Sequence, residues 1–144
     1  MALVEVRNDY AVSPDALWDV TTDYAKLALL NAGMVAMRNI PTGRLATGDD
    51  FTCEVSLFGL LPWQPYRIRI REVNDAGRFF LSEEDGSGVD MWRHRSSVIA
   101  TEGGAALIDR IEIEAGWKTA LVARWATLLY RRRHPARLRL LGLA

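Results

Sequence analysis

The sequence predicts an α+β domain in which a curved antiparallel sheet of about six to seven strands wraps around a long C-terminal helix. Three observations carry this prediction: two short helical segments follow one opening strand, strand-like alternation then continues to residue 114, and an amphipathic helical stripe closes the chain. The 144 residues contain no repeat, linker or low-complexity tract. We therefore expect one domain over residues 1–144.

The first part of the chain reads as a strand followed by a pair of short helices. Residues 3–8 alternate in the manner of a strand. Ser13 then suits the N-cap of a helix, Pro14 suits its first position, and Asp15 complements its positive end. A second short helix is expected over residues 24–30, where Asn-Ala-Gly stops it.

The middle of the chain reads as a series of strands separated by turn residues. The expected strands cover residues 34–40, 51–57, 66–71, 78–84, 91–100 and 106–114. Short turns between consecutive strands imply an antiparallel meander. A sheet of this length must curl, and only the final helix is large enough to cover its concave face.

The last segment carries an apolar stripe at helical spacing. Its members stand at i, i+4, i+7 and i+8: Leu121, Trp125, Leu128 and Leu129. A proline inside a helix costs about 3 kcal/mol, so we expect the helix to end or kink near His134, just before Pro135.

Charge and composition exclude several classes of function. Residues 117–144 carry seven basic residues and no acid, but arginines suit a helix C-terminus and no nucleic-acid motif accompanies them, so no nucleic acid is expected. No apolar run approaches the ~18 residues that span a membrane, and the first residues do not resemble a secretory signal. Cys53 is the only cysteine and is expected to be an inert buried thiol. These features favour a reducing cytoplasm.

Metal and nucleotide chemistry lack their usual signals. The two histidines lie far apart without a cluster of metal-ligand residues. No Gly-rich loop joins a strand to a helix, and no G-x-S-x-G elbow occurs. We expect no metal and no cofactor.

Three ordered motifs carry a resemblance to a known superfamily. They are V-S-P-D-A-L-W-D-V at 12–20 with Asp-Tyr at 23–24, W-R-H at 92–94 with L-I-D-R-I at 107–111 and A-G-W at 115–117, and Y-R-R-R-H-P-A-R at 130–137. Together they resemble the helix-grip superfamily of START-like, pollen-allergen-like and polyketide-cyclase-like proteins, SRPBCC, and within it a bacterial ligand-binding branch. The resemblance covers nearly the whole chain. It implies an internal pocket, but members include binders of lipids, sterols, aromatic polyketides or hormones as well as cyclases and dehydratases, so the fold fixes no reaction.

Strand register predicts which polar residues face the pocket. If Gly103 and Gly104 form a two-residue hairpin turn, His94 and Asp109 share the apolar inner face, and His94 pairs with Ile113. Asp109 then lies four residues along the strand, at ~13 Å, too far for a hydrogen bond. The structural alternatives are a core histidine bonded to backbone or to Tyr66, and an aspartate that bonds helix amides.

The preceding turn decides the inner face of the neighbouring strand. If its turn is residues 86–87, Phe79 lies opposite His94 and Leu81 opposite Trp92, both facing inward. Glu83 then points inward and Glu84 outward, an assignment that a longer loop would reverse.

The expected function is binding of a small hydrophobic or aromatic ligand between the sheet and the last helix. The candidate ligand-binding residues are Tyr66, Phe79, Leu81, Trp92, His94, Ile111, Ile113, Leu121, Arg124, Trp125 and Leu128. The alternative is a polyketide cyclase or dehydratase type of enzyme in which His94 is the acid or base and Asp109 or Glu83 a second proton carrier. A third hypothesis is an interaction protein that docks a partner through its basic C-terminal end. The sequence leaves open whether the chain is an enzyme and whether it forms a homodimer.

Overall fold

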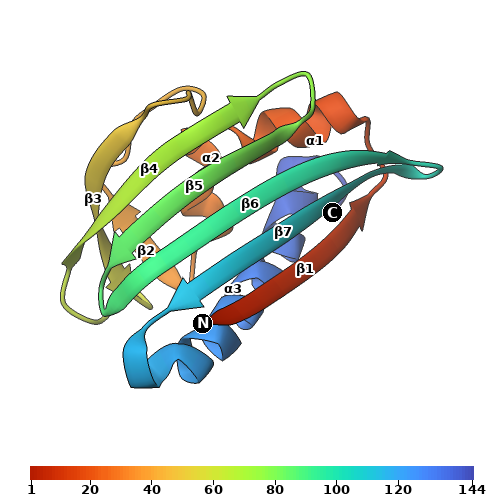
Figure 1. Ribbon diagram of the computed structural model, residues 1–144. Helices are drawn as coiled ribbons and strands as arrows, with labels where there is room; N and C mark the ends of the chain where they lie inside the picture. The colour runs from red at the N-terminus through yellow and green to blue at the C-terminus, as the bar shows by residue number, and fades with distance from the viewer.

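A computed structural model describes residues 1–144 as a curved sheet of seven strands that wraps around a long helix (Figure 1). The elements are, in chain order, β1 (Ala2–Tyr10), α1 (Pro14–Thr21), α2 (Tyr24–Leu30), β2 (Val35–Arg38), β3 (Asp50–Leu57), β4 (Gln64–Asn74), β5 (Phe79–Gly86), β6 (Val89–Thr101), β7 (Gly104–Glu114), the 3-10 turn η1 (Gly116–Lys118) and α3 (Thr119–Leu140). The predicted α+β helix-grip fold is confirmed. No helix is long and apolar enough to cross a membrane.

Strands β2 to β7 form an antiparallel meander, and β1 is added at its edge beside β7. Its order is β1-β7-β6-β5-β4-β3-β2, and every neighbouring pair is antiparallel. The N-terminal strand therefore pairs with the last strand, as Figure 1 shows, and α3 lies along the concave face. The interior-facing side chains of β3 to β7 thus point toward α3 and toward the two short helices.

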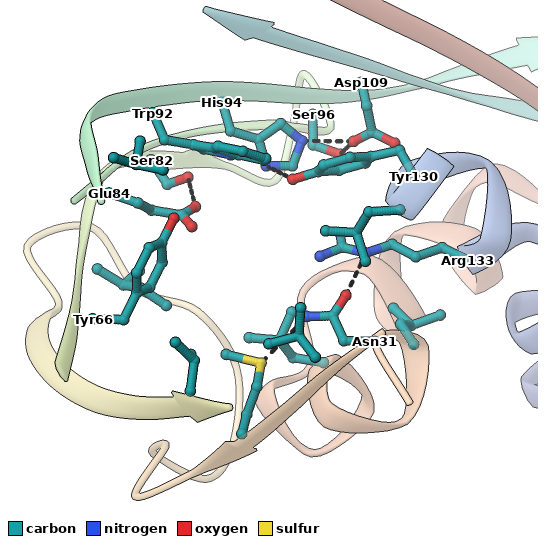
Figure 2. A pocket seen from close by; sticks show the side chains of 18 of the residues that line it. Asn31, Tyr66, Ser82, Glu84, Trp92, His94, Ser96, Asp109, Tyr130 and Arg133 are labelled. Atoms are coloured by element: carbon teal, nitrogen blue, oxygen red, sulfur yellow. Dashed lines mark hydrogen bonds and ion pairs between the residues drawn. The ribbon is translucent and has the colours of Figure 1, made fainter. Parts of the chain in front are cut away.

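The apolar interior is divided into three clusters rather than one. Leu129 and Tyr130 of α3 pack against the strands at one end, with Ile111 and Ile113 fully buried beneath them. Leu17 belongs to a second cluster under α1. A third lies along β3 and β4. The side chains that face the space between α3 and the sheet are drawn in Figure 2.

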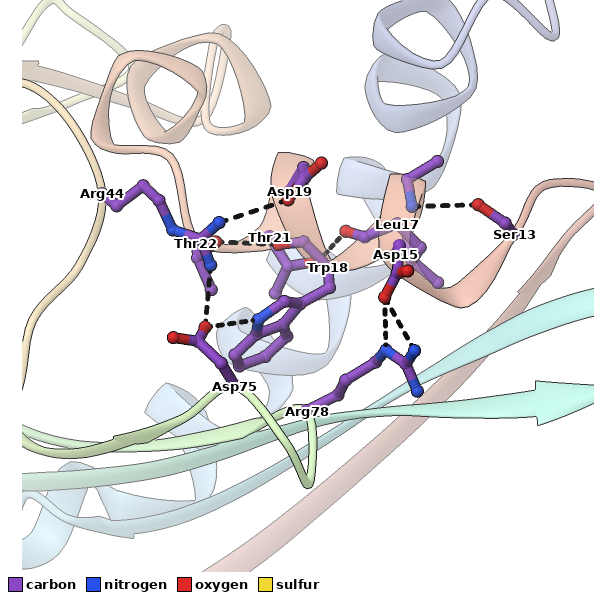
Figure 3. A network of polar contacts seen from close by, with 11 residues as sticks. Ser13, Asp15, Leu17, Trp18, Asp19, Thr21, Thr22, Arg44, Asp75 and Arg78 are labelled. Carbon is purple, nitrogen blue, oxygen red and sulfur yellow. Dashed lines mark hydrogen bonds and ion pairs between the residues drawn. The ribbon is translucent and has the colours of Figure 1, made fainter.

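The first helix is capped as its sequence predicts and is fastened to the β4–β5 turn (Figure 3). Ser13 Oγ accepts a hydrogen bond from the backbone N–H of Ala16 at 3.1 Å. Trp18 Nε1 donates to Asp75 Oδ1 at 2.8 Å, and Arg78 pairs with Asp15 at 2.7 Å. These contacts hold α1 across the end of the sheet.

The register of β6 and β7 differs from the predicted one by two residues. Thr101 pairs with Gly104, so the turn is residues 102–103, and His94 pairs with Ile111. Gly104 is instead the first residue of β7, where an added Cβ would meet backbone atoms of Tyr10 and Val12. A shift of two preserves the faces of both strands, but it moves Asp109 next to His94.

The register of β5 and β6 differs by an odd number, which reverses the face of β5. Gly86 pairs with Val89, and a bulge follows Glu84. Phe79 and Leu81 therefore pair with residues on the outer face, where the ring of Phe79 lies under Arg95. Their predicted inward placement is wrong.

The two glutamates of β5 are reversed for the same reason. Glu84 lines the interior, whereas Glu83 forms an ion pair with Arg71 at 3.0 Å on the outer face. The prediction that Glu83 points inward is wrong, and the bulge is the cause.

The prediction for the last helix was an end or a kink near Arg133–His134. The helix continues through Pro135 to Leu140, so it does not end there. Pro135 lies on the exposed side of the helix. Water can therefore donate a hydrogen bond to the helix carbonyl oxygen that the missing N–H leaves without a partner. A proline is less costly there than on a packed face.

Candidate functional site

A cavity of about 600 Å³ lies between α3, α2 and the concave face of the sheet. Most of its 33 lining residues are hydrophobic. Of the residues predicted to face the pocket, the structure places these on the cavity wall: Tyr66, Trp92, His94, Asp109, Leu121, Arg124, Trp125 and Leu128. Ile111 and Ile113 lie instead in the packed core beside it, and Phe79 and Leu81 lie outside.

The cavity has an apolar rim. Leu121 and Leu128 line it but are 65% and 47% exposed. Phe58, from the loop after β3, stands edge-on to the ring of Trp125 with 5.2 Å between centroids. Arg124 is exposed beside them. The rim thus joins the β3–β4 loop to the first turns of α3.

His94 and Asp109 form a hydrogen-bonded pair on the cavity wall (Figure 2). His94 Nε2 and Asp109 Oδ1 are 2.7 Å apart, and the two residues are only 4% and 3% exposed. Ser96 Oγ donates to the same carboxylate oxygen at 3.0 Å. The predicted separation of these two residues is therefore wrong, since the shifted register makes them diagonal neighbours across the two strands.

The surroundings of Asp109 favour its ionised form. Burial raises the pKa of this carboxyl, but the hydrogen bond and charge of His94, helped by Arg137 and Arg133, lower it further than burial raises it. The ionised carboxylate can accept hydrogen bonds from both Ser96 and His94, so Nε2 is the nitrogen that carries a hydrogen toward Asp109.

The other ring nitrogen of His94 faces a phenol. Tyr130 Oη lies 3.3 Å from His94 Nδ1, and the two rings meet edge-on. Burial raises the pKa of Tyr130, so the phenol keeps its proton; it donates to Nδ1 when the imidazole is neutral and accepts from Nδ1–H when the imidazole is protonated. Both ring nitrogens of His94 therefore have partners within the protein. The contacts run from Asp109 through His94 to the phenol oxygen of Tyr130.

The neighbouring strand β5 carries an acidic group on the cavity wall, next to Trp92 and His94. Ser82 Oγ donates to Glu84 Oε2 at 2.9 Å, and the Tyr66 phenol points toward the same carboxylate in Figure 2. Burial and the negative charge of Glu84 raise the pKa of Tyr66. This side of the wall therefore offers a carboxylate and two neutral hydroxyls.

Two buried arginines of α3 also line the cavity, and sequence reasoning missed them as site residues. Arg133 is 8% exposed, and its Nε donates to Asn31 Oδ1 at 2.8 Å. Arg137 is 2% exposed, and its Nη1 donates to Tyr10 Oη at 3.3 Å. A signal was present: both continue the spacing of four residues that begins at Trp125.

The remaining candidate groups offer little chemistry. No cluster of three His, Cys, Asp or Glu side chains could hold a metal ion. Cys53 is fully buried, and burial raises the pKa of its thiol to about 11. Its Sγ lies 3.4 Å from the carbonyl oxygen of Tyr66, to which the thiol donates.

The curved sheet, the long helix and the cavity between them make up the helix-grip fold. The chain belongs to the family described as "Domain of unknown function (DUF8410)", whose model matches residues 30–140. No curated protein matches it.

Solved structures with very different sequences share this fold. Protein CV1439 from Chromobacterium violaceum has a TM-score of 0.79 at 12% identity, with 96% of each chain covered. A START superfamily protein from Mycobacterium smegmatis has a TM-score of 0.71 at 10% identity, with 97% of each chain covered. Ara h 8.0201 has a TM-score of 0.66 at 12% identity, with 96% of this chain and 98% of the other covered.

Proposed function

We propose that this protein binds a small, mainly apolar or aromatic ligand in the cavity between α3 and the sheet. One observation carries the proposal: a cavity of about 600 Å³ is lined largely by hydrophobic side chains with a few polar groups between them. Pockets for small molecules commonly have volumes of about 300–1,000 Å³ and this mixture of side chains.

The physical reason is the poor hydration of such a wall. Water inside the cavity finds few hydrogen-bonding partners on the apolar surfaces. A ligand that displaces this water gains roughly 25 cal/mol for each Å² of apolar surface removed from solvent. Each of the three core clusters contributes side chains to the cavity wall: Trp92 from the first, Phe80 from the second and Val55 from the third.

Filling the cavity is expected to weaken ligand binding strongly without unfolding the protein. Val55 of β3 is buried on the cavity wall, and Val55→Phe would place a ring in the space that a ligand occupies. We expect the uncharged fluorescent probe N-phenyl-1-naphthylamine to bind the wild type and to bind the variant at least about tenfold more weakly. Fluorescence titration measures both dissociation constants.

The matched control adds the same ring outside the cavity. Ile99 of β6 lies on the outer face and is partly exposed, so Ile99→Phe should bind the probe as the wild type does. Failure of the wild type to bind the probe or any of a set of fatty acids, sterols and aromatic acids would contradict the proposal, as would unchanged binding by Val55→Phe.

A second candidate function is acid–base catalysis of the polyketide cyclase or dehydratase type. The observation that favours it is the buried contact of His94 with Asp109, since an oriented histidine is the commonest general acid or base. Tyr130 occupies Nδ1 of His94, so a proton would pass to or from a substrate through the phenol, or Tyr130 would have to turn away.

Removing the imidazole tests this second function. With an aromatic poly-β-ketone as substrate, His94→Gln is expected to lower kcat by about 10²- to 10⁴-fold if His94 transfers a proton. His134→Gln, which removes the other histidine and is not on the cavity wall, should retain activity. Equal turnover by both variants, or none by a wild type that binds the substrate, would rule the mechanism out.

A further inference from the structure

We infer that the ligand of this cavity carries one carboxylate, held by the guanidinium groups of Arg133 and Arg137. The inference rests on the proposed function, because it concerns the chemistry of the molecule bound in the same cavity. It names a class of ligand: a monocarboxylic acid with an apolar body.

The first support is the position of Arg133. Its side chain extends from α3 into the cavity, with its Nε held by Asn31 at the C-terminal end of α2 (Figure 2). The carbon at the centre of the guanidinium lies 4.3 Å from the centre of the Tyr130 ring. Nε is the only guanidinium nitrogen of Arg133 that has a hydrogen-bond partner in the protein. The two terminal nitrogens are therefore held in a fixed orientation and are free to bind an anion.

The second support is the unsatisfied state of Arg137. Its Nε is completely buried and has no hydrogen-bond partner, and its one hydrogen bond goes to the phenol of Tyr10. An arginine cannot lose its charge to relieve burial, and a buried charge without a partner costs several kcal/mol. A bound anion would remove this cost.

The third support is a count of buried charges. Arg133 and Arg137 are both buried, whereas Asp109 is the only buried acidic residue of the chain. Asp109 already accepts hydrogen bonds from His94 and Ser96 and forms no ion pair with either arginine. Neither Arg133 nor Arg137 therefore has an ion-pair partner in the protein, and a carboxylate is the planar anion that guanidinium groups bind best.

The acidic side of the cavity limits the ligand to one carboxylate. Glu84 and Arg133 stand on opposite sides of the cavity in Figure 2. A second carboxylate at the far end of a ligand would meet Glu84, where like charges repel. An apolar or hydroxyl-bearing end would instead pack against Trp92 or donate a hydrogen bond to Glu84.

The test compares ligands that share one alkyl chain and differ in charge. Decanoate, decanol and decanedioate are titrated against the N-phenyl-1-naphthylamine complex at pH 8, and displacement gives their dissociation constants. We expect the wild type to bind decanoate about 10- to 100-fold more tightly than decanol, as charge-assisted hydrogen bonds would give. Decanedioate should bind more weakly than decanoate.

The matched variants differ only in which arginine is replaced. Arg133→Met keeps a long unbranched side chain and should bind decanoate and decanol with similar affinity, while its affinity for decanol stays near that of the wild type. Arg132→Met removes the neighbouring, exposed arginine and should keep the full preference for decanoate.

The outcomes separate this inference from the proposed function. If the wild type binds the naphthylamine probe but prefers decanol or shows no preference, the carboxylate inference is overturned and the proposed function stands. If it binds neither the probe nor any decyl compound, both fail. The comparison of decanoate with decanol on the wild type tests the carboxylate inference even if Arg133→Met does not fold.

Discussion

Asp109→Ala is expected to lower the free energy of unfolding by about 3–5 kcal/mol, the usual cost of removing one partner from a buried ionic contact. The substitution would leave His94 Nε2 and Ser96 Oγ without their shared acceptor. It would also remove a buried negative charge that interacts with the buried arginines Arg133 and Arg137, both of which lower the pKa of Asp109. Urea unfolding followed by circular dichroism measures the loss.

The control for this prediction is an acid on the outer face of the same strand. Glu112 pairs with Arg93 at 3.3 Å, and both side chains are partly exposed, so Glu112→Ala should cost no more than about 1 kcal/mol. A loss for Asp109→Ala no greater than that for Glu112→Ala would mean that the buried contact contributes little.

Acid pH should reproduce part of the effect. The pKa of Asp109 is lowered in the folded state, so the stabilisation from its ionised form is present above the unfolded value of about 3.9 and is lost as the pH falls through the folded value. The difference in stability between the wild type and Asp109→Asn should therefore be constant near neutral pH and shrink below about pH 4. A difference that does not change with pH would contradict this assignment.

The fold could be predicted because it depends on signals that are local in the sequence. Ser13 and Pro14 mark the start of the first helix, and the alternation along each strand marks the two faces of the sheet. The inward side of His94 and Asp109 was also predictable, because a register error of two residues leaves each strand face unchanged.

The contact between His94 and Asp109 could not be predicted because it depends on the exact turn. Moving the turn by one residue, from 103–104 to 102–103, changes the partner of His94 from Ile113 to Ile111. That change replaces a long separation by a hydrogen bond of 2.7 Å. The sequence offers two adjacent glycines at this turn, and their local pattern does not say which of them belongs to the turn.

The face of β5 and the role of the arginines depend on contacts that are distant in the sequence. The bulge after Glu84 has no signal of its own, yet it exchanges the faces of Phe79 and Phe80. Arg133 reads as part of a solvated basic helix end until its partner Asn31, 102 positions earlier, is known. The spacing of Arg133 and Arg137 marks one helix face but does not say that this face is buried.

Gly104→Ala is expected to lower the free energy of unfolding by about 3 kcal/mol or more. Gly104 has a φ of +145°, and a Cβ at this position would meet the carbonyl oxygen of Tyr10 and would lie 2.7 and 2.8 Å from backbone atoms of Val12. These are backbone atoms of the segment that joins β1 to α1, so no side chain can turn away to make room. The chain must distort the start of β7 or move that segment.

The same substitution should disturb the site, because Gly104 opens the strand that carries Asp109 and pairs with Thr101 in the register that brings Asp109 to His94. Gly103→Ala is the matched control, since a Cβ there meets no atom within 4 Å and the change should stay within about 0.5 kcal/mol. We expect Gly104→Ala to weaken binding of N-phenyl-1-naphthylamine as well as stability, and Gly103→Ala to change neither. Equal stability of the two variants would mean that the turn tolerates a side chain at either glycine, and that the register of β6 and β7 is set by the packing of the inner faces instead.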